Sequence, residues 1–83
     1  MKYPDYASLP EHVRGMLRAV TNDDRAAERY YHAPNKNLKG DTLHAMINRP
    51  FGQKVVEHFL YDLGNYLGAD DMDDYKASFG KKK

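Results

Sequence analysis

The sequence predicts an all-α protein: a single domain, residues 1–83, folded as a small bundle of four to five helices. Three observations lead to this fold class. Apolar residues recur at helical spacing in several segments, and the longest of these runs from Pro50 to about Leu67. Proline, glycine and polar capping residues separate the segments. No segment shows the alternation of apolar and polar residues that is typical of a half-buried strand.

The first predicted helix follows an extended lead-in over residues 1–8. Ser8 and Glu11 have the spacing of a capping box, and Pro10 is tolerated in a first helical turn. The apolar residues that follow recur at i, i+3, i+4 and i+7: Val13, Met16, Leu17 and Val20. This spacing places them on one face of a helix, which we expect to pack against the rest of the domain.

The second predicted helix covers residues 23–31 and has two aspartates in its first turn, where the helix dipole favours acidic groups. Pro34 ends it, and the segment PNKNLKG has the composition of a turn that Leu38 anchors in the core. We expect Gly40 or Asp41 to cap a short third helix. The apolar side of that helix consists of Leu43, Met46 and Ile47.

The fourth and longest predicted helix starts at Pro50, which presets the first turn, and Gly68 is placed to end it in a left-handed conformation. The apolar stripe that we expect it to bury consists of Phe51, Val55, Val56, Phe59, Leu60, Leu63 and Leu67. The residues that we expect to face away are Lys54, Glu57, Asp62 and Asn65.

The C-terminal segment, residues 68–83, predicts a fifth, short helix over 69–79. Aspartates crowd its first turn and Lys76 lies near its end, an order that the helix dipole favours. Its apolar residues share one face: Met72, Tyr75 and Phe79. Because a helix this short is unstable in isolation, we expect it to dock, either on the domain itself or on a partner protein. The segment ends in Lys81–Lys83.

Length and composition limit the class of protein. A chain of 83 residues buries only about 60% of its unfolded surface, so a partner protein or a second copy in a homodimer would add stability. The net charge is +1 and cysteine is absent, which excludes disulfides and thiolate chemistry. The N-terminus does not resemble a signal peptide, and no apolar run approaches the length of a membrane span. We therefore expect a cytoplasmic protein without a membrane partner.

Catalytic and metal-binding patterns are absent from the sequence. The four histidines do not form an H-x-x-x-H or H-E-x-x-H arrangement: His12, His32, His44 and His58. His58 and Asp62 are four residues apart, which is typical of a solvated pair on a helix. Ser8 and Ser78 lack the glycine elbow of a serine nucleophile, and no glycine-rich phosphate loop is present. The sequence predicts a protein that is not an enzyme and has no metal or cofactor.

A basic surface between Arg14 and Lys39 supports an alternative, a small nucleic-acid-associated regulator. Its cationic residues are Arg14, Arg18, Arg25, Arg29, Lys36 and Lys39, with Tyr30 and Tyr31 among them. Such residues contact phosphates and stack on bases. The nearly neutral net charge argues against nucleic acid as the partner, and the two tyrosines are more simply explained by core packing.

The central stretch carries a specific motif. It reads Tyr30-Tyr31-x-x-Pro34-Asn35-x-x-Leu38-x-Gly40-x-Thr42 and continues through Ile47, Pro50, Gly52 and Val56. In its residues and spacing it resembles the Xre/MbcA/ParS toxin-binding domain, the C-terminal half of bacterial antitoxins paired with RES-class toxins. The resemblance covers residues 11–67. Leu43 stands where that family has proline and Arg49 where it has threonine, and the family's N-terminal helix-turn-helix domain has no counterpart, so we expect no operator binding.

The motif residues have roles that physical chemistry explains without the resemblance. Pro34 ends a helix, and the Asn35 side chain can bond the backbone of its own turn. Gly40 suits a positive φ, and Thr42 contributes to the start of a helix. Gly52 allows another backbone or ring to approach closely. We therefore interpret the motif as a scaffold, with the binding surface on the polar side of the long helix and along the tail.

The resemblance implies a non-catalytic module, bacterial or from a phage, that binds and occludes the active site of a RES-type, NAD-consuming toxin. In that family the C-terminal segment often contributes. The candidate contact residues are therefore Asp70, Asp71, Asp73, Asp74, Tyr75 and Phe79. The acidic side chains would meet a basic pocket, and the two rings would anchor apolarly. A related alternative is a phage or mobile-element protein that uses the same scaffold to inhibit a host or defence protein.

Overall fold

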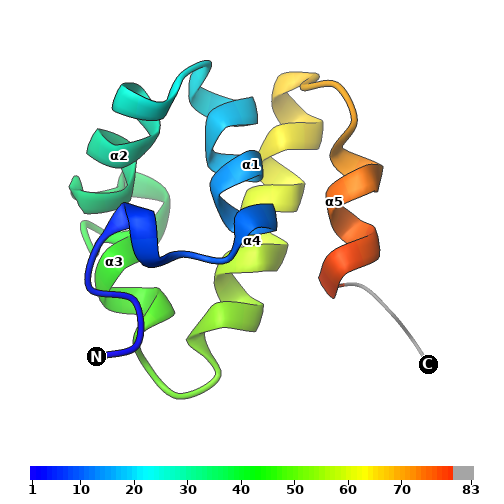
Figure 1. The fold of residues 1–83 in the computed structure, drawn as a ribbon. Helices are drawn as coiled ribbons and strands as arrows, with labels where there is room; N and C mark the ends of the chain where they lie inside the picture. Colours follow the sequence, from blue (N-terminus) through cyan, green and yellow to red (C-terminus); the bar gives the residue numbers. More distant parts are fainter. Residues whose placement is uncertain (80–83) are drawn as a thin grey trace.

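The computed structural model describes residues 1–79 and confirms the predicted all-α bundle (Figure 1). The elements are η1 (Tyr6–Ser8), α1 (Glu11–Thr21), α2 (Asp24–His32), η2 (Lys36–Leu38), α3 (Leu43–Ile47), α4 (Gly52–Leu67) and α5 (Met72–Phe79). Within residues 1–79 there is no strand, only one isolated bridge between Pro34 and Thr42. The radius of gyration is 11.7 Å, close to the value of about 12 Å expected for a compact chain of this length.

Helices α1 and α4 form the centre of the bundle. They pack against each other, with α2 and α3 on one side and α5 on the other (Figure 1). Helix α5 contacts both central helices, so this helix docks on its own domain. The buried core draws on every α-helix and on the N-terminal segment: Tyr3, Tyr6, Leu9, Val13, Met16, Leu17, Ala27, Tyr31, Leu43, Ile47, Val56, Leu60, Met72 and Phe79.

Tyr31 lies at the centre of this core. Its side chain is fully buried, and its hydroxyl donates a hydrogen bond of 2.8 Å to the carbonyl oxygen of Tyr3. Burial disfavours the phenolate and raises the pKa of Tyr31 to about 12. The interpretation of Tyr31 as a core residue, and not a stacking platform for bases, is confirmed by this burial.

The N-terminal segment differs from the predicted extended lead-in. Asp5 caps the 3-10 helix η1, accepting a hydrogen bond of 2.9 Å from the backbone N–H of Ser8. The Ser8 hydroxyl donates in return to the Asp5 carbonyl oxygen at 2.7 Å. The predicted capping box between Ser8 and Glu11 is therefore wrong, because Ser8 is already engaged in the preceding turn. Helix α1 begins at Glu11 after Pro10, without a side-chain cap.

The turn between α2 and α3 has most of the predicted chemistry. The Asn35 side chain accepts a hydrogen bond of 3.0 Å from the backbone N–H of Asn37, and Gly40 has a φ of +88°. The cap of α3 is Thr42, whose hydroxyl accepts from the backbone N–H of Ala45 at 2.9 Å. Thr42 replaces the predicted Gly40 or Asp41 cap.

Asp41 has a different partner from the predicted helix cap. Its carboxylate lies 2.6 Å from the guanidinium of Arg49, in an ion pair that closes the α3 region. Hydrogen bonding from Arg49, supported by the backbone N–H of Thr42, lowers the pKa of Asp41.

Helix α4 begins at Gly52, two residues later than predicted. Phe51 precedes it as the N-cap with a φ of +62°, a left-handed conformation that is uncommon outside glycine. A Cβ atom on Gly52 would overlap the carbonyl oxygen of Met46, so the close approach expected here is confirmed. Gly68 ends the helix with a φ of +77°, as predicted. Helix α5 then begins at Met72, three residues later than the expected start.

Candidate functional site

The apolar residues of α4 divide into a buried set and an exposed set. The buried residues of the helix that face the core include Gly52, Val56, Leu60 and Gly64. The exposed ones, with their exposed fractions, are Phe51 at 90%, Val55 at 52%, Tyr66 at 86% and Leu67 at 55%. The predicted burial of Phe51, Val55 and Leu67 is therefore wrong.

Helix geometry explains the division. Each residue turns about 100° around the axis, so side chains five positions apart, such as Val55 and Leu60, project about 140° apart. One core cannot cover both directions. The predicted stripe was too wide for a helix with a single buried face, and that excess width is the sequence signal that could have revealed an exposed apolar face.

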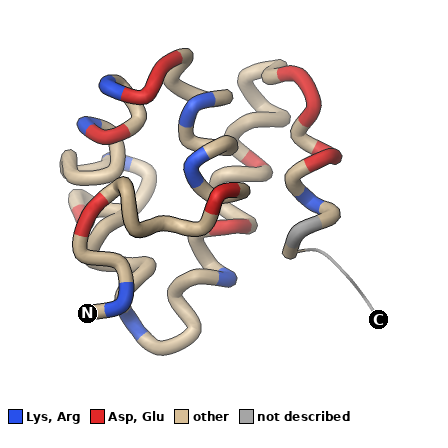
Figure 2. Tube along the Cα trace, viewed as in Figure 1, with Lys and Arg blue, Asp and Glu red and all other residues tan. Residues whose placement is uncertain are grey.

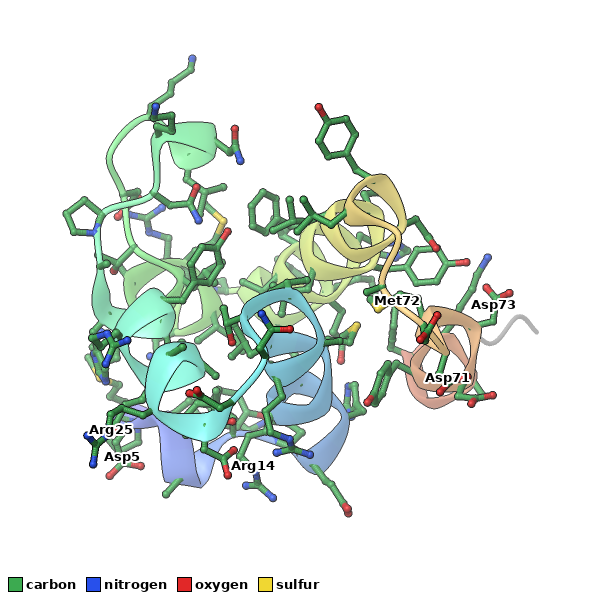
Figure 3. The ribbon with its side chains drawn as sticks, turned by 90° about the horizontal axis from the view of Figure 1, so that it is seen from above. Asp5, Arg14, Arg25, Asp71, Met72 and Asp73 are labelled. Atoms are coloured by element: carbon green, nitrogen blue, oxygen red, sulfur yellow. The ribbon has the colours of Figure 1, made fainter. Side chains whose placement is uncertain are left out.

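We define the outer face of α4 by Phe51, Val55, Phe59, Asp62 and Tyr66. Successive members are three or four residues apart, which places them on one side of the helix. Phe59 is half-buried and the other four are exposed. In Figure 3, α1 and α5 lie on one side of α4, and no helix of residues 1–79 covers the opposite side.

The two ends of α4 carry opposite charge. Lys54 is exposed near the start of the helix, and Arg49 precedes it in its ion pair with Asp41. At the other end, residues 62–79 contain five aspartates and one lysine, a net charge of −4. Figure 2 shows this acidic group around the turn between α4 and α5. The C-terminal residues Lys81–Lys83 lie outside the described residues.

The two aromatic residues predicted as partner anchors pack within the domain. Phe79 is buried, with its ring centroid 5.4 Å from that of His58 and 6.1 Å from those of His12 and Tyr61. Tyr75 is half-buried over Gly15, where a Cβ atom would come within 2.5 Å of the tyrosine ring. In this structure neither ring is presented to a partner, because α5 uses both to dock on α1 and α4.

The four aspartates predicted as contact residues remain exposed: Asp70, Asp71, Asp73 and Asp74. Asp73 accepts a hydrogen bond of 2.6 Å from the hydroxyl of Tyr61, which fastens α5 to α4. Asp71 has a φ of +64° in the turn that starts α5. Figure 3 labels Asp71 and Asp73 on the outside of the bundle. The acidic half of the predicted site is thus accessible and adjoins the exposed Tyr66 and Leu67 end of α4.

A buried polar network joins the N-terminal segment, α1 and α4. Glu57, predicted to face away, is 5% exposed, and its carboxylate lies 2.6 Å from Nε2 of His12. Gln53 donates to the same carboxylate at 3.0 Å and accepts from the Tyr3 hydroxyl at 2.6 Å. A buried carboxylate requires such partners, and this one links segments 45 residues apart. Nothing local in the sequence identifies a partner at that separation.

His12 also borders a hollow between α1 and α5. The hollow has a volume of about 410 Å³ and is lined by Glu11, His12, Gly15, Arg18 and Tyr75. A second pair of histidines, His32 and His44, has ring centroids 5.1 Å apart. Within residues 1–79, no three His, Cys, Asp or Glu side chains gather in a way that could hold a metal ion.

Some of the predicted basic side chains form hydrogen bonds or ion pairs within the domain. The Arg14 guanidinium donates to the carbonyl oxygens of Ala7 and Leu9 at 3.0 and 2.7 Å. Arg18 pairs with Asp24 at 3.3 Å. In Figure 3, Arg14 and Arg25 project from different helices, at separate points of the surface. Arg14 and Arg25 therefore do not lie on one continuous stripe for a phosphate backbone.

No protein-family model, curated protein or solved structure matches the chain. Among the described residues, no helix combines the length and the apolar character that crossing a membrane requires.

Proposed function

We propose that this protein is a non-catalytic, antitoxin-like binding module that occludes a partner protein such as a RES-type, NAD-consuming toxin. The observation that carries the proposal is the outer face of α4, on which Phe51 and Tyr66 leave about nine-tenths of their surfaces exposed. The motif that resembles the toxin-binding domain builds the turns and helix starts that hold α4 in place.

The concentration of these residues distinguishes them from ordinary surface apolar groups. Single exposed apolar side chains are common on folded proteins. Here, four of the five large hydrophobic residues exposed within residues 1–79 belong to α4 or its N-cap. Aromatic side chains are enriched among the residues that dominate binding energy at protein interfaces. A helix face of this kind is a common recognition element for another protein.

The acidic turn beside this face adds electrostatic selectivity. Asp70 and Asp71 follow directly after the exposed Tyr66 and Leu67 end of α4. A partner with a basic substrate pocket would be attracted to this end, and association would be faster at low salt. Tyr66 supplies the apolar anchor that Tyr75 and Phe79 were predicted to supply. The contact surface proposed here therefore consists of the outer face and the acidic turn.

The same surface serves the related alternative, a phage or mobile-element protein that inhibits a host or defence protein. That version has the same mechanism, binding and occlusion, with a different target. The nucleic-acid alternative receives no support from the arrangement of Arg14, Arg18 and Arg25.

Titration of NAD consumption tests the proposal. Each of a panel of purified RES-type toxins is mixed with increasing amounts of this protein, and we expect inhibition that saturates near equimolar ratio for a cognate toxin. Phe51→Asp combined with Tyr66→Asp should weaken inhibition by at least tenfold per residue, since each such anchor contributes about 2 kcal/mol or more. The control is Ala7→Asp, which adds one of these two negative charges at an exposed position of η1.

Two outcomes would contradict the proposal in different ways. Absence of inhibition across the panel would remove the RES-type toxin as the partner class. Full inhibition by the folded double variant would remove the outer face as the contact surface.

A further inference from the structure

We propose that a second copy of this chain covers the outer face of α4, in an antiparallel pairing of the two α4 helices about a two-fold axis. The inference concerns the same surface as the proposed function. In the absence of the target the second copy occupies the face, and the target displaces it.

The spacing of the exposed rings fits this pairing. Phe51 and Tyr66 are fifteen residues apart, which corresponds to about 22 Å along a helix. When one helix is reversed against its copy, Phe51 of each copy lies opposite Tyr66 of the other. The midpoint of this register falls between His58 and Phe59. An isologous interface of this kind uses the same patch twice and is the commonest arrangement in small homo-oligomers.

The charges fit the same register. The point halfway between Lys54 and Asp62 is residue 58. It differs by half a residue from the midpoint between Phe51 and Tyr66. The antiparallel pairing therefore brings Lys54 of each copy, at the margin of the outer face, to the level of Asp62 of the other along the helix axis. A parallel pairing would bring Lys54 against Lys54 and Asp62 against Asp62, which costs free energy. Antiparallel helices also oppose their dipoles favourably.

The apolar area indicates a weak and exchangeable dimer. Fully buried aromatic side chains cover about 150–250 Å² each, so Phe51, Tyr66 and Val55 give about 500 Å² per copy. The total of about 1,000 Å² is at the lower limit of specific protein interfaces. Association of this size is typically weak, in keeping with displacement by a target that engages the acidic turn as well. The pairing would also stabilise a domain that is small enough to be marginal alone.

Sedimentation velocity with reversed charges tests the inference. We expect the wild-type protein to shift from monomer to dimer between 10 and 500 μM, on the order of the affinity typical for such a small interface. Lys54→Glu and Asp62→Lys should each remain monomeric, because every copy then presents two like charges to its partner. An equimolar mixture of the two variants should recover the dimer. In the mixed dimer, the glutamate introduced at position 54 of one copy faces the lysine introduced at position 62 of the other. The unchanged Asp62 and Lys54 face each other in the same way.

Folding is controlled within the same experiment. Both positions are exposed, and Lys54→Glu places an acidic group in the first turn of α4, where the dipole favours it. Helical content measured by circular dichroism should therefore match the wild type. Recovery of the dimer in the mixture shows directly that both variants are folded.

A wild-type chain that stays monomeric up to 500 μM would overturn the inference, because the dimer is expected to form between about 10 and 500 μM. Undiminished dimerisation of both single variants would also overturn it, by placing the interface elsewhere. None of these measurements involves a toxin. A chain that dimerises as described but inhibits no toxin would therefore support this inference and contradict the proposed function. A chain that inhibits a toxin but stays monomeric would support the proposed function and contradict this inference.

Discussion

The inner and outer faces of α4 contain the same kinds of residue, yet only one of them is covered. On the inner face, Val56 and Leu60 are almost completely buried against α1 and α3. On the outer face, Phe51 and Tyr66 remain exposed, although their side chains are larger and aromatic. Hydrophobic periodicity therefore identifies the helix but does not tell which of its apolar directions the domain itself covers. The uncovered direction is where a binding partner has most to gain.

Substitution of Gly52 should produce the largest effect and would break the inner face. Gly52→Ala places a Cβ atom against the carbonyl oxygen of Met46, a backbone atom that cannot rotate away. We expect destabilisation of about 3 kcal/mol or more, above the usual range for overpacking because the obstacle is main chain. Urea denaturation followed by circular dichroism measures it.

The control for this prediction is Gly40→Ala. No atom lies within 4 Å of the position that a Cβ would take at Gly40, so only its positive φ opposes the substitution. That conformational cost is about 1 kcal/mol. Equal losses of unfolding free energy for the two variants would show that the overlap with the Met46 backbone does not add to the destabilisation.

A matched pair of truncations compares the two faces directly. Leu60→Ala removes a fully buried side chain and should cost about 2–5 kcal/mol. Val55→Ala removes an exposed side chain of the same helix and should change stability by less than about 0.5 kcal/mol. Thermal unfolding at low protein concentration, where the monomer predominates, gives both values. Similar losses at the two positions would mean that the outer face is part of the folding core.

A small loss of stability at neutral pH is expected for Tyr31→Phe, which keeps the ring and removes the hydroxyl. The Tyr3 carbonyl oxygen still accepts from the Asn48 side chain at 2.9 Å, so the loss should be about 1 kcal/mol. Because the folded pKa of about 12 exceeds the unfolded value of 10.0, this group stabilises the fold fully below pH 10. That contribution disappears as the pH rises from 10 to 12.

Alkaline unfolding curves measure the pH-dependent part of this prediction. The wild type should lose stability between pH 10 and 12 more steeply than Tyr31→Phe, which has no phenol to ionise at this position. Burial and the hydrogen bond to Asp24 also raise the pKa of Tyr6. Because Tyr6 is present in both proteins, its contribution cancels in the difference between the two curves. Parallel curves would mean that Tyr31 ionises without cost in the folded protein.

The positive-φ glycines and the Asn35 turn were predicted well from the sequence, whereas the caps of α1 and α3 were not. Gly40 and Gly68 both have the expected positive φ, and the Asn35 side chain bonds the backbone of its own turn as expected. These features depend on residues within a few positions of one another. The number and type of the helices follow from the same local signals.

The errors arise where distant segments meet. Glu57 is buried because His12, on another helix, pairs with it. Phe79 is buried because rings from α1 and α4 surround it. Helix α4 begins at Gly52 because the backbone of Met46 lies against it. Of the candidate site, the acidic turn was found from the sequence, whereas Phe51 and Tyr66 were not, since their exposure depends on how α4 sits in the bundle.

The most direct test of the outer face is the sedimentation behaviour of Phe51→Asp combined with Tyr66→Asp, at concentrations where the wild type dimerises. We predict a compact monomer at every concentration, because both residues are exposed and the domain does not need them to fold. A dimer like that of the wild type, or an expanded and unfolded chain, would contradict the conclusion that this face of α4 is a surface for binding.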